Sequence, residues 1–344
     1  YRHRDAIEEF KGYCTDIWFD QAIKWIENCN NNNDAFFAYI ATNAPHGPLW
    51  VPDHYRTPYQ ESVSNGALTP DHASFFAMIA CIDENLSNLN TFLHQKDLYE
   101  NTILIFMTDN GTAHGEQVFN AGMRGKKCSL YEGGHRVPCL IRWPAGGIPN
   151  RTKKGLSGQD VTDVTRTTDI VPTLVDLCEL SISEDFKFDG ISLANIARGI
   201  EINLEPRIAV VQYGHTVGNR GLTKDPSYTE KYKAAILWNH WRLIGHKNEL
   251  FDLLSDPGQK YDIGHKHPEV VKKMLSFYDE WWDDVGDNLE IYQPITIGSA
   301  TENPTNLSSA DWAWVYADNQ NAVRKPTLES GTWHVNVAKS GNYC

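Results

Sequence analysis

The stretch that decides the fold is Thr102-Ile-Leu-Ile-Phe-Met107, followed directly by Thr108-Asp109-Asn110-Gly111. The first part is apolar and has the length of a buried strand, and the second part is a turn sequence. Ligands bind beyond the carboxyl ends of strands in open α/β sheets, so Asp109 and Asn110 lie where a site would form. A carboxylate and an amide oxygen suit calcium, although these residues on their own favour a simple turn.

Helices and strands alternate around this stretch. Thr15-Asp16 predicts the capped start of a helix that ends in the asparagine cluster 28–33, and apolar steps of three and four residues after Asp71 predict a long helix up to Leu93. We also expect strands at 35–41 and 137–143 and a helix at 169–178. This order predicts an α/β fold whose sheet is covered by helices.

The pattern changes after about Gly199. Short strands are expected at 207–212, 232–238, 242–245 and 249–253, the second and third joined as a hairpin through Asn239-His240, before a helix at 268–282. An Asn-, Ser- and Thr-rich stretch then leads to an alternating segment at 332–337. We therefore predict an α/β domain at 1–200, a smaller α+β subdomain at 201–285, and a linker with the start of a β-rich module at 286–344.

The overall composition restricts the partners. The 344 residues carry a formal charge of −13, which argues against nucleic acid or an anionic membrane as a partner. No apolar run is long enough for a transmembrane helix, and the seven cysteines form no C-x-x-C pair. The chain opens without Met at Tyr1 and stops at Cys344 inside the alternating segment, so we expect a fragment.

Two further motifs could carry chemistry. The prolines and glycine of Thr42-Asn-Ala-Pro-His46-Gly-Pro48 hold His46 in a stiff loop, where an imidazole can donate a proton, although a single loop histidine is more often a surface residue. The run from Met123 to Pro138 gathers four cations among glycines and could bind a tetrahedral anion. Taken alone, this run favours a solvated basic loop.

The order of these motifs is more specific than any one of them. A P-H-G-P loop, a later D-N-G and a G-x-K-x-S-L-Y-E-G-G-x-R-V-P run resemble the formylglycine-dependent sulfatases of the alkaline phosphatase superfamily. The resemblance extends from Gly12 to Trp282 and includes Glu249-Leu-Phe-Asp-Leu253 followed by Asp256-Pro257. It implies an alkaline-phosphatase-like mixed sheet flanked by helices.

The resemblance also implies roles for single residues. Asp109 and Asn110 match two calcium ligands, and His46 matches the histidine near the sulfate and its leaving oxygen. Lys127 falls on the sulfate-binding lysine of R-G-G-K-G-S, while Lys126 remains a second candidate for that contact. Lys126 and Cys128 stand where that pattern has glycines, which leaves the loop conformation open.

Other parts of the family's site are missing from the sequence. The C/S-x-P/A-x-R motif that yields the formylglycine nucleophile does not occur, and the paired aspartates and K-x-H motif also normally precede the matched region. We therefore expect these elements upstream of Tyr1, together with a maturation enzyme that makes formylglycine, and activity only in the full-length protein.

The expected activity is hydrolysis of a sulfate ester of an aryl compound or a carbohydrate, with calcium as cofactor. The alternatives are a phosphodiester or phosphonate monoester hydrolase of the same superfamily, and an inactive relative that only binds. The family's habit favours periplasm or secretion over cytosol, and the loops do not identify the substrate.

Overall fold

The computed structural model of the chain describes residues 2–3, 6–148, 158–183, 185–201, 203–212, 230–289, 294–308 and 330–343. The chain divides into two compact units, Tyr1–Glu205 and Pro206–Cys344, and each unit is described by itself. The three-part division at 200 and 285 stays a prediction.

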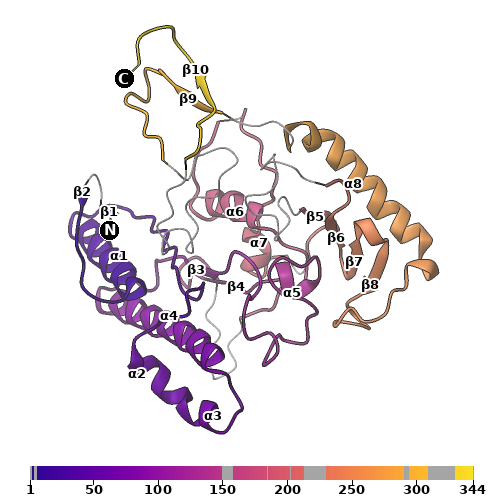
Figure 1. The fold of residues 1–344 in the computed structure, drawn as a ribbon, viewed down its shortest axis with the longest axis horizontal. Coiled ribbons are helices and arrows are strands. Elements are labelled where there is room, and N and C mark those ends of the chain that lie inside the picture. The colour runs from indigo at the N-terminus through magenta and orange to yellow at the C-terminus, as the bar shows by residue number, and fades with distance from the viewer. Residues whose placement is uncertain are drawn as a thin grey trace. The chain divides into compact units, whose positions relative to one another are not determined.

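Two long helices, α1 (Cys14–Asn31) and α4 (Pro70–Gln95), lie side by side in the first unit (Figure 1). Their apolar faces share one buried cluster: Phe19, Ile26, Leu89 and Leu93. A polar contact joins them as well, because Asn85 Nδ2 donates to Asp16 Oδ1 at 2.7 Å. Burial of these apolar faces stabilises both helices against unfolding.

The two helix starts differ from each other. The predicted cap of α1 is wrong: the helix begins at Cys14, its N-cap Tyr13 makes no side-chain cap bond, and the Thr15 side chain is buried inside the first turn. In α4, by contrast, Thr69 Oγ1 accepts from His72 N at 3.1 Å. That bond satisfies one of the free N–H groups of the first turn and fixes where α4 begins.

The predicted strand at 35–41 is wrong. The segment connects α1 to the His46 loop and is not assigned to a strand. Phe36, Ala38 and Ile40 pack into the apolar cluster of the helices, while Phe37 and Tyr39 are 73% and 85% exposed. This alternation is that of a strand. A strand also requires ladder hydrogen bonds, and no described segment pairs with this one.

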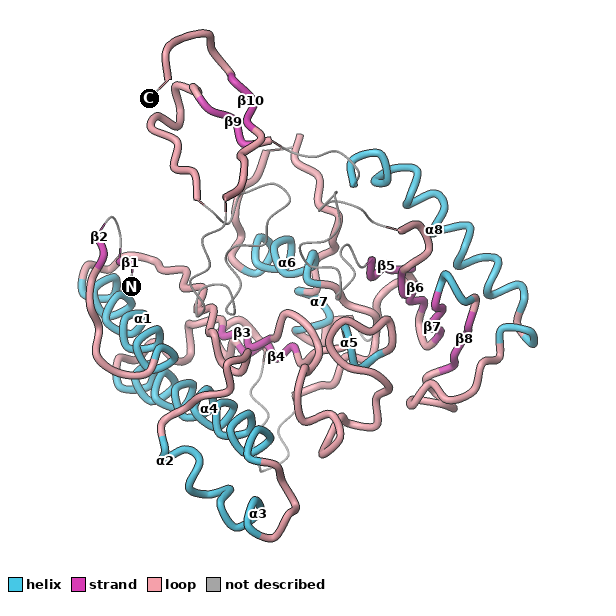
Figure 2. Tube along the Cα trace, viewed as in Figure 1, coloured by secondary structure: helices cyan, strands magenta, loops and turns pink. Residues whose placement is uncertain are grey.

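The strand at the opening motif is confirmed. β3 (Leu104–Met107) pairs antiparallel with β4 (Cys139–Arg142), so that Leu104 lies opposite Arg142 and Met107 opposite Cys139. Between the two strands the chain is mostly loop, interrupted by the short helix α5 (Glu132–His135) (Figure 2). The pairing brings the start of β4 to the end of β3, where the D-N-G turn begins.

Shorter elements complete the first unit. The predicted helix at 169–178 is confirmed as α6 (Ile170–Leu177), preceded by the 3₁₀ turn η2 (Thr167–Asp169). The remaining elements are β1 (Arg2–His3), β2 (Ala6–Ile7), α2 (Asp53–Arg56), η1 (Thr57–Tyr59), α3 (Gln60–Ser64) and α7 (Ala194–Ala197).

The second unit contains the predicted antiparallel meander and the late helix. In sheet order the strands are β5 (Ile208–Gln212), β6 (Ala234–Trp238), β7 (Trp241–Ile244) and β8 (Glu249–Asp252). Helix α8 (Pro268–Leu289) packs on this sheet and runs seven residues beyond its predicted end at 282. Two 3₁₀ turns lie beside them, η3 (Gly245–Lys247) and η4 (Gly264–Lys266).

The hairpin between β6 and β7 is confirmed, with Trp238 opposite Trp241. Asn239 has a φ of 51°, a conformation that asparagine tolerates better than most residues. Further along, β9 (Ile295–Ile297) pairs in parallel with β10 (Val335–Val337), which lies in the predicted alternating segment. None of the described helices combines the length and apolar composition that crossing a bilayer requires.

Candidate functional site

The site is built on the turn that follows β3. Asp109 is exposed and Asn110 is half-buried, and Thr108 Oγ1 donates to the Asn110 carbonyl at 3.3 Å. The turn therefore presents a carboxylate and an amide oxygen just beyond the carboxyl end of the strand. Both are hard oxygen ligands of the kind that calcium prefers.

Gly111 fixes this turn against a second segment. Its N–H donates to the Gly134 carbonyl at 3.0 Å, and a Cβ added at Gly111 would lie 1.8 Å from the Gly133 carbonyl oxygen. The two backbones are thus in direct contact, with no room for a side chain at Gly111. The glycines of the D-N-G and E-G-G motifs pack against each other in the fold.

The basic loop is closed by its own backbone. Gly133 N donates to the Arg124 carbonyl at 2.8 Å, and Ser129 N donates to the Lys126 carbonyl at 2.9 Å. A third bond, from Lys127 N to the Thr112 carbonyl at 2.8 Å, ties the loop to the turn. The structure therefore brings the lysine segment next to the segment that carries Asp109 and Asn110.

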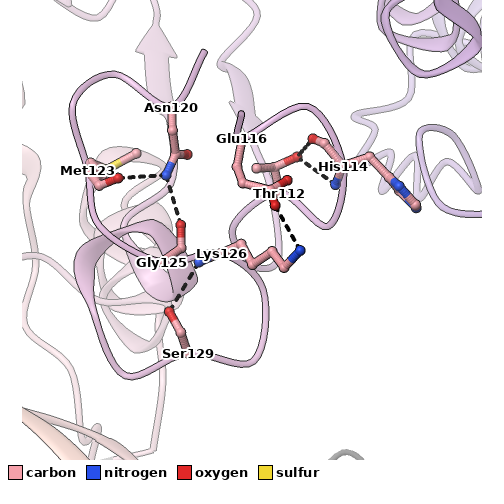
Figure 3. Close-up of polar contacts among 8 residues, drawn as sticks. All are labelled: Thr112, His114, Glu116, Asn120, Met123, Gly125, Lys126 and Ser129. Carbon is pink, nitrogen blue, oxygen red and sulfur yellow. Dashed lines mark hydrogen bonds and ion pairs between the residues drawn. The ribbon is translucent and has the colours of Figure 1, made fainter. Parts of the chain in front are cut away.

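The two candidate lysines have different surroundings. Lys126 Nζ forms an ion pair with Glu116 Oε1 at 2.8 Å (Figure 3), and this hydrogen bond lowers the pKa of Glu116. Lys127 is half-buried, and its ammonium has no acidic partner among the residues that the structure describes. Lys126 is thus already neutralised, whereas the charge of Lys127 remains available to an anion.

The unusual residue at position 128 has a conformational explanation. Cys128 has a φ of 70°, which a glycine adopts without strain. The glycine of the R-G-G-K-G-S pattern therefore matches the backbone found here. Lys126 is not among the residues with positive φ, so a side chain is accommodated at that position.

Glu132 is a buried charge inside the same loop. Its side chain is 1% exposed and lies 3.4 Å from His135 Nε2 and 3.5 Å from Arg136 Nη1. Sequence analysis missed Glu132 as well as Thr112 and Glu116. The separation of ten residues between Glu116 and Lys126 follows from the loop path, and no periodic spacing could have indicated it.

His46 lies on a different loop. His46 is exposed, and its ring Nδ1 is 2.8 Å from the Gly47 carbonyl oxygen. The backbone N–H of His46 donates to the Asn43 carbonyl at 2.9 Å. The loop is anchored by Ala44 and Val51, which share a buried cluster with Ala77, Met78 and Cys81 of α4. No hydrogen bond or ion pair of the described residues joins His46 to the D-N-G turn.

The helix α4 nevertheless supports both loops. The His114 ring centroid lies 5.9 Å from that of Phe75, and Gly115 also approaches Phe75. Phe75 lies two residues before Ala77, which belongs to the same buried cluster as Ala44 and Val51 of the His46 loop. The N-terminal half of α4 thus supports the segment after the turn as well as the His46 loop.

Asp109 and Asn110 offer the type of ligand atom that calcium prefers, but they are too few to complete its coordination. Calcium takes about six to eight oxygen ligands, and Asp109 and Asn110 supply side-chain oxygens for part of that set. The described residues contain no group of three or more His, Cys, Asp or Glu that could hold a metal ion.

Comparison with known proteins identifies the family of the chain. Residues 1–180 match the family model described as Sulfatase, and this range holds the turn, the basic loop and His46. The chain belongs to the sulfatase family. That membership confirms the resemblance inferred from the three motifs.

The curated relatives of this sulfatase chain include an arylsulfatase and a carbohydrate sulfatase. The chain is 25% identical over 319 residues to mouse "Arylsulfatase J", covering 80% of this chain and 50% of that protein. It is 27% identical over 261 residues to "N-acetylgalactosamine-6-O-sulfatase" of Bacteroides thetaiotaomicron, covering 71% of this chain and 47% of that protein. The chain thus spans about half the length of these relatives.

A solved structure supports the fold. The crystal structure of Ps i-CgsB in complex with k-i-k-neocarrahexaose superimposes with a TM-score of 0.67 at 24% identity, covering 81% of this chain and 57% of that one. The predicted α/β fold of the alkaline phosphatase type is therefore confirmed.

Replacing Gly111 tests the contact between the turn and the basic loop. Gly111→Ala should lower the free energy of unfolding by about 1–3 kcal/mol, because the new Cβ would overlap the Gly133 carbonyl. Gly47→Ala is the control, since a Cβ there meets no atom within 4 Å. Equal unfolding midpoints in urea for both variants would contradict the close contact.

Acid titration tests the Lys126–Glu116 pair. The pKa of Glu116 is lowered in the folded state. The ion pair therefore stabilises the folded state fully at pH values above the unfolded pKa of about 4.3. This stabilisation is lost as the pH falls through the folded-state pKa. At pH 7 the free energy of unfolding of the wild type should be higher than that of Glu116→Gln by no more than about 1 kcal/mol, because Lys126 is 51% exposed. Thermal unfolding should show this difference shrinking as the pH falls below that unfolded pKa; a difference independent of pH would contradict the ion pair.

Proposed function

We propose that the whole protein is a sulfuric ester hydrolase and that this chain supplies the anion-binding and proton-donating half of its active site. The observation that carries the proposal is the contrast between Lys126, paired with Glu116, and Lys127, which has no acidic partner in the described chain. Sulfatase family membership supports the reaction class.

Lys127 is the proposed sulfate-binding residue. Its backbone N–H donates to the Thr112 carbonyl, and this bond fixes the point on the loop from which the lysine side chain extends. In an otherwise acidic chain of charge −13, a local cation is needed to offset repulsion of an anionic substrate. Lys126 is the poorer candidate because a sulfate would have to compete with Glu116.

Asp109 and Asn110 are the proposed calcium ligands of this chain, and further ligands must come from elsewhere in the whole protein. When bound, calcium would neutralise charge on the sulfate oxygens, and a formylglycine formed by a maturation enzyme would provide the nucleophile. The turn contributes rigidity, since Gly111 locks it to the basic loop.

His46 is the proposed proton donor to the leaving oxygen. In the doubly protonated ring, Nδ1–H donates to the Gly47 carbonyl oxygen at 2.8 Å and orients the ring, and the proton on Nε2 is the one given to the leaving oxygen. The loop is stiffened by its anchor on α4, and this limits the positions that the imidazole can adopt.

The proposed substrates are aryl or carbohydrate sulfates. The names of the mouse and Bacteroides relatives support this range, since one is an arylsulfatase and the other acts on an N-acetylgalactosamine 6-sulfate. We further propose that the protein acts in the periplasm or after secretion. Assaying phosphonate monoesters and phosphodiesters beside sulfates separates the alternative hydrolase, and tight binding without turnover of any ester would indicate an inactive relative.

Separate replacement of the lysines in the full-length protein tests the assignment. Lys127→Ala should lower kcat/KM for an aryl sulfate by about 10²–10³-fold, because an unneutralised sulfate oxygen is left in the transition state. Lys126→Ala is the matched control and should lower it less than about 10-fold. Steady-state kinetics that reverse this order would assign the sulfate contact to Lys126.

The role of His46 is tested by the leaving group. His46→Ala should lower turnover by about 10²-fold or more for an alkyl sulfate, whose alkoxide needs a proton, and much less for 4-nitrophenyl sulfate. His54→Ala, a change of an exposed histidine near the same loop, is the control and should leave both rates unchanged. Equal losses on the two substrates would exclude proton donation by His46.

A further inference from the structure

The segment 115–120 is clamped to the lysine loop at both ends. At one end Glu116 accepts from Lys126 Nζ at 2.8 Å. At the other end Asn120 Nδ2 donates to the carbonyls of Met123 and Gly125, each at 2.8 Å (Figure 3). These bonds tie the segment to the lysine loop at Glu116 and at Asn120.

An apolar pair projects from this clamped segment. Val118 is 45% exposed and Phe119 is 76% exposed, and the N–H of each donates to the Gly115 carbonyl, at 2.9 and 3.0 Å. A single exposed apolar residue is ordinary. Here the ring is attached to a fixed backbone that is bonded directly to the loop carrying Lys126 and Lys127.

Such a ring suits one kind of ligand. An aromatic side chain packs well against a flat apolar surface, either an aryl ring or the C–H face of a sugar. Because the backbone is already ordered, little conformational entropy is lost when a ligand ring packs on it.

We propose that Phe119 is a specificity-determining residue that packs against the ring bearing the sulfate group, with Val118 extending the apolar surface. This inference rests on the proposed function, because Lys127 must hold the sulfate end of the same ligand. It assigns Phe119 to selection of the substrate and gives it no part in the chemical step.

Sulfonates test the inference without any ester to cleave. Calorimetric dissociation constants for the full-length protein would be compared for methanesulfonate, benzenesulfonate and 6-deoxy-6-sulfoglucose, which share the anionic group and differ in the ring. Phe119→Ala should weaken binding of at least one ring-bearing sulfonate by about 3–10-fold and change methanesulfonate less than about twofold. The exposed side chain makes a folding defect unexpected, and thermal unfolding checks this.

The control is Phe186→Ala, since Phe186 is a 60% exposed phenylalanine of the same unit, outside the clamped segment. If Phe119→Ala weakens the binding of benzenesulfonate alone, the ligand ring is an aryl group. If it weakens the binding of 6-deoxy-6-sulfoglucose alone, the ligand ring is a carbohydrate. Unchanged binding in Phe119→Ala, or an equal loss on methanesulfonate, would overturn the inference. Binding that depends on Phe119 in a protein unable to hydrolyse sulfate esters would overturn the proposed function alone.

Discussion

The contact between the backbone at Gly111 and the backbone at Gly133 and Gly134 is the constraint on which the site depends. The Gly111 N–H donates to the Gly134 carbonyl at 3.0 Å, so the two backbones are in direct contact. A side chain at Gly111 would fit only if one of the two segments moved. With the bond between Lys127 and Thr112, this contact makes the D-N-G turn and the basic loop one structure. The turn with the proposed calcium ligands Asp109 and Asn110 is thereby held next to the loop with Lys127, the proposed sulfate-binding residue.

Electrostatics then distinguish two neighbouring residues of the same type. Lys126 and Lys127 are adjacent in sequence, yet the acidic partner Glu116 reaches only Lys126. The pair also fixes one end of the segment that exposes Phe119. This ion pair thus occupies Lys126 and not Lys127, and it ties the segment that exposes Val118 and Phe119 to the loop that carries both lysines.

Local patterns predicted the elements that are stabilised by local features. Helix α4 and the hairpin at Asn239 were found because apolar steps and turn chemistry specify them within a few residues. The segment 35–41 has the alternation of a strand, but a strand also depends on a partner that its own residues do not encode. The motif residues were found in the same local way, whereas the Glu116–Lys126 pair depends on the path of a loop.

The central claim is that Lys127 holds the sulfate group next to Asp109 and Asn110, while Lys126 stays on Glu116. A crystal structure of the full-length protein with a bound aryl sulfonate tests it most directly. The account predicts Lys127 Nζ within about 3 Å of a sulfonate oxygen and an intact Lys126–Glu116 pair. A sulfonate bound by Lys126, with the Glu116 pair broken and Lys127 turned to solvent, would contradict it.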